Sequence, residues 1–282
     1  MRARDEVLIT ATELARLIDA GDPPAILDVR WRLDDPDGRA AYLGGHVPGA
    51  VYVSLEDELS DHSVTGRGRH PLPSGRKLQV AARRWGVRQA DLVVVYDDWN
   101  RAGSARAWWV LTAAGLEEVR ILDGGLPAWR SSGGNLETCP VHPRAGNVTV
   151  PHDDLYTGAR ATLTAEQTGD VALLDARAPE RFRGDVEPLD PVAGHIPGAE
   201  NLPSGAVLSQ DGTFIGDKAL SRLLSDHGVD GDGRVGVYCG SGVTAAVTIA
   251  ALAATGREAA LYPGSWSEWC SDPTRPVGRG TE

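Results

Sequence analysis

Cysteine is scarce in this sequence, and a long apolar segment is missing. The three cysteines, Cys139, Cys239 and Cys270, are odd in number and far apart. This argues against a disulfide framework and against a zinc site, and it fits a reducing cytosol. No apolar run approaches the roughly 18 residues that a membrane span needs, and the charged first ten residues lack the apolar core of a secretory signal. We therefore expect a cytoplasmic protein.

Positive charge is also in short supply, with 28 Lys and Arg against 39 Asp and Glu and a formal net charge of -11. Nucleic acids and anionic membranes are poor partners for such a chain, because binding to them depends on clustered basic residues. One short basic run, Arg67 to His70, stands in a stretch rich in Gly and Pro. We interpret it as a solvated surface loop.

What the chain does contain is an internal repeat. Four motifs of the first half recur in the same order in the second half, offset by 140 to 149 residues. The pairs are Leu27–Arg30 with Leu174–Arg177, Gly45–Ala50 with Gly194–Ala199, Val95–Asp97 with Val237–Cys239, and Gly124–Trp129 with Gly264–Trp269. This period is far too long for a solenoid, so we interpret the chain as one duplicated domain.

Each half has the pattern of an α/β domain. Short apolar runs predict buried strands at 25–29, 91–96, 171–175 and 234–238. A capping-box pattern starting at Thr10 predicts a helix before the first strand, and 162–166 repeats it in the second half. Runs of small residues predict helices over about 104–114 and 244–254. The alternation indicates parallel sheets covered on both faces by helices.

The candidate reactive residue is Cys239, which ends a predicted strand and is followed by a Gly-Ser-Gly turn and a helix. Ligands of open parallel sheets bind at the carboxyl ends of strands. Gly240 and Gly242 permit a tight curl whose backbone amides bind an anion, and the helix N-terminus favours thiolate over thiol. The alternative is a small buried residue, which is common for free cysteine. We apply that alternative to Cys139 and Cys270, which lack such a loop.

The first half offers an internal control. Asp97 stands at the position that matches Cys239, and Asp97-Asp98-Trp99-Asn100 replaces the glycine loop. Because a carboxylate cannot perform thiolate chemistry, we expect the first domain to be catalytically silent and to form one wall of the cleft.

With these motifs the chain resembles the rhodanese superfamily in its tandem form, the thiosulfate and 3-mercaptopyruvate sulfurtransferases. The resemblance covers nearly the whole chain and is carried by the paired motifs, the Cys-Gly-Ser-Gly-Val-Thr loop and the closing Gly-x-x-x-x-Trp. It implies two tandem rhodanese-like domains, each a parallel sheet flanked by helices. The inactive one would cover residues 1–135, the linker 136–158, and the catalytic one 159–282.

The resemblance also implies a two-step reaction. The Cys239 thiolate takes the outer sulfur of a small donor, thiosulfate or 3-mercaptopyruvate, and releases sulfite or pyruvate. The loop amides of Gly240, Ser241, Gly242, Val243 and Thr244 hold the resulting persulfide. A thiophilic acceptor such as cyanide, a thiol or a thioredoxin-like protein then removes it. No metal and no organic cofactor is implied.

Further site residues follow from the resemblance. The family's substrate-binding arginine maps onto Arg181, where a guanidinium can pair an oxyanion bidentately; the alternative, an exposed surface arginine, suits Arg183 better. Trp31 is a candidate for the cleft wall. Arg30 and Arg177, directly after their strands, are expected to make structural ion pairs.

The two doubled histidines leave an alternative open. His46 and His195 occupy corresponding loops of both halves, which favours a role in the fold. In mercaptopyruvate-type relatives the first-domain histidine has been considered part of a Ser–His–Asp relay. Here that relay would involve Ser241, His46 and Asp35 or Asp37.

The donor is the least determined feature. The uncharged side chains at 240 and 241 favour 3-mercaptopyruvate, whereas animal thiosulfate-type enzymes carry basic residues there. However, the second carboxylate-binding arginine that mercaptopyruvate-type relatives have after Glu-Pro is missing from Glu187-Pro188-Leu189-Asp190. We lean to thiosulfate.

Two other functions remain as alternatives. A cysteine phosphatase or arsenate reductase of related fold would need an arginine near the end of the loop to hold transition-state oxygens, and 240–246 contains none. A non-enzymatic module that binds or relays sulfur is the second; the intact Cys239 loop argues for chemistry instead.

Overall fold

The computed structural model describes residues 3–21, 23–229 and 233–281, and its first half contains a parallel sheet with the strand order β1-β5-β4-β2-β3. The strands are β1 (Leu8–Ile9), β2 (Ala25–Asp28), β3 (Val51–Tyr52), β4 (Val93–Tyr96) and β5 (Val119–Leu122). β4 is fully buried, as its four apolar or aromatic residues in a row predict.

The second half repeats this arrangement with the order β7-β6-β8-β9, again with parallel pairing throughout. Its strands are β6 (Ala172–Asp175), β7 (Glu200–Asn201), β8 (Val235–Tyr238) and β9 (Ala260–Leu261). β6 and β8 lie side by side, as β2 and β4 do. The predicted duplication of a parallel α/β domain is therefore confirmed.

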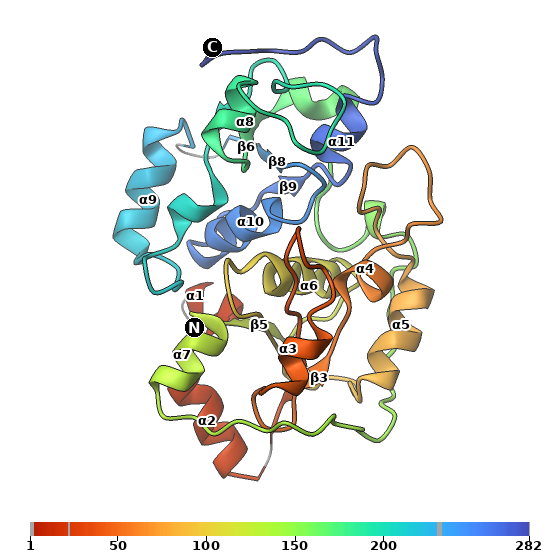
Figure 1. Cartoon of the computed structure of the whole chain (residues 1–282), viewed down its shortest axis with the longest axis vertical. Helices are drawn as coiled ribbons and strands as arrows, with labels where there is room; N and C mark the ends of the chain where they lie inside the picture. Colours follow the sequence, from red (N-terminus) through yellow and green to blue (C-terminus); the bar gives the residue numbers. More distant parts are fainter. Residues whose placement is uncertain (1–2, 22, 230–232, 282) are drawn as a thin grey trace.

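Helices cover both faces of each sheet (Figure 1). Those of the first half are α1 (Ala3–Val7), α2 (Ala11–Asp19), α3 (Arg39–Leu43), α4 (Leu55–Glu58), α5 (Gly75–Arg84), α6 (Ala102–Ala113) and α7 (Gly125–Ser131). The second half has α8 (Pro179–Arg183), α9 (Asp217–Asp226), α10 (Ala245–Ala254), α11 (Ser265–Trp269) and the 3₁₀ turns η1 (Leu155–Thr157), η2 (Ala165–Asp170) and η3 (Ser204–Val207). Across the described ranges, no helix combines the length and hydropathy that crossing a bilayer requires.

The two capping boxes have different outcomes. Thr10 and Glu13 cap α2 reciprocally, as predicted. Thr164 and Gln167 form the same box, but only the 3₁₀ turn η2 follows it. That segment contains Thr and Gly, which are poor helix formers, so a six-residue 3₁₀ segment stands in place of the predicted second helix.

The strand-end arginines form the predicted ion pairs. Arg30 pairs with Asp28 at 2.7 Å, and Arg177 pairs with Asp175 at 2.6 Å, all four being buried. Each guanidinium also donates to the carbonyl just before the doubled histidine, at Gly45 and Gly194, over 2.7 Å in both cases. These contacts explain why the two motifs recur together in both halves.

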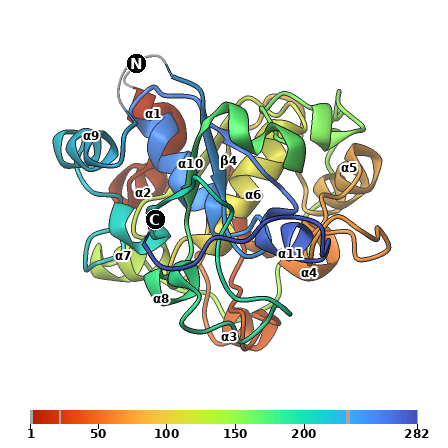
Figure 2. The ribbon, with the colours of Figure 1, turned by 90° about the horizontal axis from the view of Figure 1, so that it is seen from above.

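The two domains meet at their central helices. α6 and α10 pack against each other, and in Figures 1 and 2 they lie together in the middle of the molecule. Every residue of α6 and nearly every residue of α10 is buried, as expected for helices apolar on all sides. Each helix follows the central strand of its sheet, so the loops that open them both lie near the interface.

Candidate active site

Cys239 lies directly after β8 and is 2% exposed. Its backbone is held from both sides by the start of α11. The Cys239 amide donates to Oγ of Ser265 over 3.1 Å, and its carbonyl accepts from the amide of Trp266 over 3.0 Å. Because both backbone groups are bonded, the direction in which the thiol leaves the strand is fixed.

The loop after Cys239 requires glycine at one position and leaves its donors available. Gly242 has a φ of +77°, and a side chain there would collide with the carbonyl of Pro263. Among the described residues, no amide from Gly240 to Thr244 donates to a protein acceptor. Successive unpaired amides ahead of a helix N-terminus can bind an anion, so the loop has the geometry that the predicted anion site needs, and the site itself stays a prediction.

Arg106 of α6 fixes this loop from the first domain. It is fully buried and donates to the carbonyls of Gly242 (3.2 Å), His70 (3.0 Å) and Leu59 (3.1 Å). No carboxylate in the described ranges forms an ion pair with it, and burial lowers the pKa of Arg106 to about 10. It therefore places a buried positive charge behind the loop while tying both domains to it.

A polar chain runs from the loop into the first domain. The Oγ of Ser241 lies 2.7 Å from Nδ1 of His70, and Nε2 of His70 lies 3.1 Å from Oε1 of Glu56. Glu56 also accepts from Nε1 of Trp31 over 2.6 Å and contacts His62 at 2.9 Å. We call Ser241, His70 and Glu56 the proton relay.

Burial and the neighbouring charge act in opposite directions on the pKa of each titratable group of the relay. Burial lowers the pKa of His70 against the opposing effect of Glu56. Partial burial of Glu56 is outweighed by its hydrogen bonds and by the charge of His70, which together lower its pKa to about 2. An ionised Glu56 can only accept, so Nε2 of His70 carries the proton and Nδ1 accepts from Ser241.

The relay through His46 is therefore wrong. His46 is buried elsewhere, with its ring stacked on Tyr42 and its nitrogens 3.0 Å from the carbonyls of Val47 and Cys139. His195 is likewise stacked, on Phe182. Both doubled histidines hold their own loops, which agrees with the predicted role in the fold.

The carboxylates proposed for that relay also lie apart from it. Asp37 bonds to the amide of Arg39 and to the hydroxyl of Tyr52. Asp35 is exposed. Neither approaches His70, whose carboxylate partner is Glu56.

Trp31 and Arg181 do lie at the site. Trp31 packs edge-on against His70, with ring centroids 5.8 Å apart. A methyl group at Gly240 would lie 3.5 Å from Nη1 of Arg181. Arg183 instead pairs with exposed Asp185, as expected for a surface arginine.

The basic run at 67–70 is not a solvated loop. It crosses to the second domain, where the amide of Arg69 donates to Oγ of Ser267 over 3.0 Å. A side chain at Gly68 would lie 2.7 Å from the same hydroxyl, and His70 is 5% exposed. Gly68, with a φ of +78°, makes this close approach possible. The approach in turn brings His70 to the loop after Cys239.

Glu56, His70 and Arg106 were missed from the sequence. One signal could have found His70: it is a histidine of the first half with no counterpart in the second, where the matching stretch around 210–219 has none. A residue that recurs in both halves serves the fold that the halves share. A polar residue found in one half alone is therefore the better candidate for a site to which the two domains contribute differently. The same signal marks Arg106, because the matching stretch 246–255 contains no arginine, whereas Glu56 has Glu200 in its matching stretch and is not marked.

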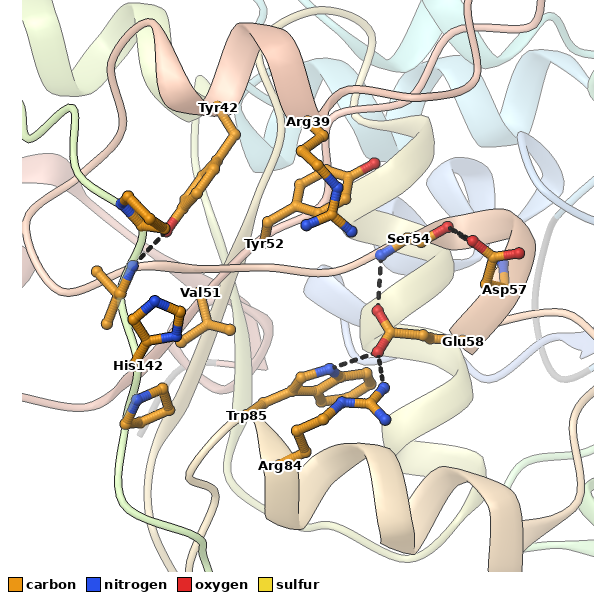
Figure 3. A pocket seen from close by; sticks show the side chains of 13 residues that line it. Arg39, Tyr42, Val51, Tyr52, Ser54, Asp57, Glu58, Arg84, Trp85 and His142 are labelled. Carbon is orange, nitrogen blue, oxygen red and sulfur yellow. Dashed lines mark hydrogen bonds and ion pairs between the residues drawn. The ribbon is translucent and has the colours of Figure 1, made fainter.

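The pocket in Figure 3 lies away from this site, in the first domain. It has a volume of about 510 Å³ and is lined by residues of α3, α4, α5 and the segment 140–143. Within it, Glu58 accepts from the Ser54 amide, Nε1 of Trp85 and Arg84. In the described part of the chain, no group of three His, Cys, Asp or Glu side chains is arranged to hold a metal.

Comparison with known proteins agrees with this geometry. The model of the rhodanese-like domain matches the chain twice, over residues 10–132 and 160–272. Mycobacterium tuberculosis "Putative thiosulfate sulfurtransferase SseB" is 74% identical, and the alignment covers all of both chains. Pseudomonas aeruginosa "Probable 3-mercaptopyruvate sulfurtransferase" is 44% identical over 97% of this chain and 98% of that protein.

A solved structure shows the same arrangement of two domains. The crystal structure of SseA from Escherichia coli, which has the rhodanese fold of the 3-mercaptopyruvate enzymes, superposes with a TM-score of 0.79 at 34% identity. The match covers 92% of this chain and 98% of that one. The chain therefore belongs to the rhodanese family, in the tandem-domain form of its sulfurtransferase relatives.

Proposed function

We propose that this sulfurtransferase carries its sulfur as a persulfide on Cys239. The observation that supports this most strongly is the loop itself, in which buried Cys239 directly precedes the backbone amides of 240–244, which have no protein acceptor in the described chain. Such donors stabilise the negative sulfur without the need for a metal. Buried Arg106, bonded to Gly242, adds positive charge behind them.

The two candidate donors make different demands on the site. With thiosulfate, the Cys239 thiolate attacks the outer sulfur, the S–S bond breaks, and its electron pair leaves with sulfite. No proton moves. With 3-mercaptopyruvate, the thiolate attacks the thiol sulfur and the C–S bond breaks toward the enolate of pyruvate. The thiol proton must then reach that carbon, so that a persulfide anion and pyruvate remain.

The proton relay favours 3-mercaptopyruvate as the preferred donor, with thiosulfate second. Ser241 directly follows Gly240, and its hydroxyl is bonded to a neutral imidazole that can accept and return a proton. Loading from thiosulfate involves no proton transfer and so does not need such a group. This reverses the preference that the sequence suggested, which rested on a missing arginine in 187–190.

The second step delivers the outer sulfur of the persulfide to a thiophile. We propose cyanide or a thiol as the acceptor, including the thiol of a thioredoxin-like protein in the cytoplasm. The acceptor attacks the outer sulfur, the S–S bond breaks, and Cys239 returns as a thiolate. Three free cysteines are compatible with a reducing compartment.

The persulfide is tested by mass spectrometry of the reduced protein after incubation with each donor. We expect one added sulfur on the peptide that contains Cys239, removed by cyanide or by a thiol, and no addition in Cys239→Ser. Absence of added sulfur with both donors would contradict the proposal.

The donor preference is tested with His70→Gln. Loss of proton transfer should slow loading from 3-mercaptopyruvate by about 10²-fold, the usual contribution of general acid–base catalysis, and leave loading from thiosulfate nearly unchanged. Equal slowing with both donors would show that His70 supports the loop alone. His142→Gln, which removes an exposed histidine that lines the separate pocket of Figure 3, is the matched control.

A further inference from the structure

A guanidinium from the first domain lies over the catalytic loop. A methyl group at Gly240 would lie 2.9 Å from Nη2 of Arg69 and 3.5 Å from Nη1 of Arg181. Arg69 belongs to the segment between α4 and α5, and Arg181 belongs to α8. Two arginines, one from each domain, therefore converge on the residue that follows Cys239.

Buried carboxylates hold both guanidinium groups in place. Asp190 is 4% exposed and pairs with Nη1 of Arg69 and, at 3.4 Å, with Nη2 of Arg181. Glu187 is 3% exposed and accepts from Nε and Nη2 of Arg181 at 3.2 and 2.6 Å. Charge-assisted pairs of this kind fix a planar guanidinium in position as well as in orientation.

The opposite edges of the two arginines are unoccupied by protein. In the part of the chain that the structure describes, Nη2 of Arg69 and Nη1 of Arg181 have no acceptor. These are the atoms nearest to Gly240. The side chains are 29% and 15% exposed, so a small solute can reach them.

We propose that Arg69 is the second guanidinium of the donor site, recruited from the first domain by Asp190. The ligand is the oxyanion end of the sulfur donor, either a carboxylate or the sulfonate-like end of thiosulfate, held between Arg69 and Arg181. The inference rests on the proposed function, because it concerns the donor that loads Cys239. The arginine that the resemblance leads one to expect in 187–190 is thus replaced by an aspartate that positions an arginine from elsewhere.

The test measures the rate of Cys239 loading against donor concentration. The variant is Arg69→Ala combined with Asp190→Asn, and it is compared with Asp190→Asn alone because Asp190 also pairs with Arg181. Losing one charge-assisted hydrogen bond should raise the KM for the donor about 10- to 100-fold and leave kcat within about threefold. A rise with only one donor would show which oxyanion the pair reads.

Two controls separate binding from structure. Arg67→Ala removes a charge from the same segment, where the guanidinium lies over the ring of Tyr156, and should leave KM unchanged. Arg69→Lys keeps the charge and loses the fork, and should recover part of the affinity. An unchanged KM for both donors in the double variant would overturn the inference, as would a KM that changes only in step with the melting temperature.

Calorimetric binding of sulfite and of pyruvate asks the same question without turnover. Affinity for at least one of these product anions should fall about tenfold in the double variant. If the wild-type protein fails to load Cys239, the proposed function fails, and this measurement still decides whether Arg69 binds oxyanions. Equal affinity of wild type and double variant for both anions would overturn the inference.

Discussion

The loop after β4 and the loop after β8 occupy equivalent places, and they satisfy their backbone amides in opposite ways. In the first domain the Asp97 carboxylate folds back into its own loop and accepts from the amides of Trp99 (3.1 Å), Arg101 (3.3 Å) and Ser104 (3.0 Å). In the described part of the second domain, the amides of 240–244 have no protein acceptor. The amides of the first loop, which we call the silent loop because it lacks a cysteine, thus already hold an anion that is part of the chain.

A second difference reinforces the first. Arg101 is fully buried in the silent loop, adopts a φ of 63° and pairs with Asp97 at 2.8 Å. A side chain at neighbouring Gly125 would collide with it. The second domain has Ser265 at that place, and its hydroxyl accepts from the Cys239 amide. The first loop thus contains a buried ion pair, whereas a serine hydroxyl takes the corresponding place beside the second.

The strongest way to break the comparison is to give the active loop the residue of the silent one. Cys239→Asp should reduce persulfide loading below about 10⁻³ of wild type, since no nucleophilic sulfur remains. Its carboxylate should accept from the loop amides as Asp97 does, so Cys239→Asp should be more stable than Cys239→Asn by about 1–2 kcal/mol. Urea unfolding of both variants checks this, and an equally stable Asn variant would contradict an anion-binding loop.

Removing the carboxylate of the silent loop should lower the free energy of unfolding and leave the loading of Cys239 unchanged. Asp97→Ala leaves the buried Arg101 guanidinium without its partner, which typically destabilises by about 3–5 kcal/mol. Loading of Cys239 per folded molecule should remain near the wild-type rate. The measurement is the urea midpoint together with the loading rate below it.

Removing both partners supplies the control for this prediction. The double variant Asp97→Ala and Arg101→Met should recover most of the lost stability, because no unpaired charge is buried. A single variant as stable as wild type would show that the ion pair does not close the silent loop.

The smallest expected effect is on the pH dependence of the loading rate. It distinguishes His70, which is bonded to the loop after Cys239, from His46 and His195, which hold their own loops. The pKa of His70 lies below its usual 6.5 because the ring is buried. The rate of loading from 3-mercaptopyruvate should therefore persist below pH 6.5 and fall only as the pH drops through that lowered pKa. Loading from thiosulfate, which needs no proton, should lack this inflection.

Glu56→Gln provides the matched variant, since Glu56 raises the pKa of His70 and its removal should move the inflection to lower pH. Stability follows the same sign. A depressed folded-state pKa means that the contribution of His70 is complete above pH 6.5 and is lost as the pH falls through the folded value. An inflection that moves to higher pH in Glu56→Gln would contradict this assignment.

The fold could be predicted from the sequence because it depends on local patterns, and the same kind of pattern carries the prediction of Cys239 as the nucleophile. The paired motifs, the apolar strands and the glycine loop at Cys239 each depend on neighbours within a few residues. The extent of the domains and of the linker at 136–158 stays a prediction. Doubling also identified what His46 and His195 do for the fold.

The other half of the site could not be predicted in this way. His70 reaches Ser241 across 171 positions in the sequence, and Arg106 reaches Gly242 across 136. These contacts follow from how α6 packs on α10, which no local pattern encodes. Gly68 was interpreted as part of an ordinary Gly- and Pro-rich loop, whereas in the structure it lets the segment 67–70 approach the second domain.

The position of Arg106 has a consequence for how the two copies can diverge. After a duplication, the copy that loses its nucleophile is ordinarily released from selection on chemistry. Here the copy that has Asp97 in place of a cysteine supplies Arg106 and His70 to the loop of the other, and both are bonded to it. Substitutions in the first half therefore change the surroundings of Cys239. A gene that encoded the second half alone would encode the Cys239 loop without the guanidinium of Arg106 and the imidazole of His70.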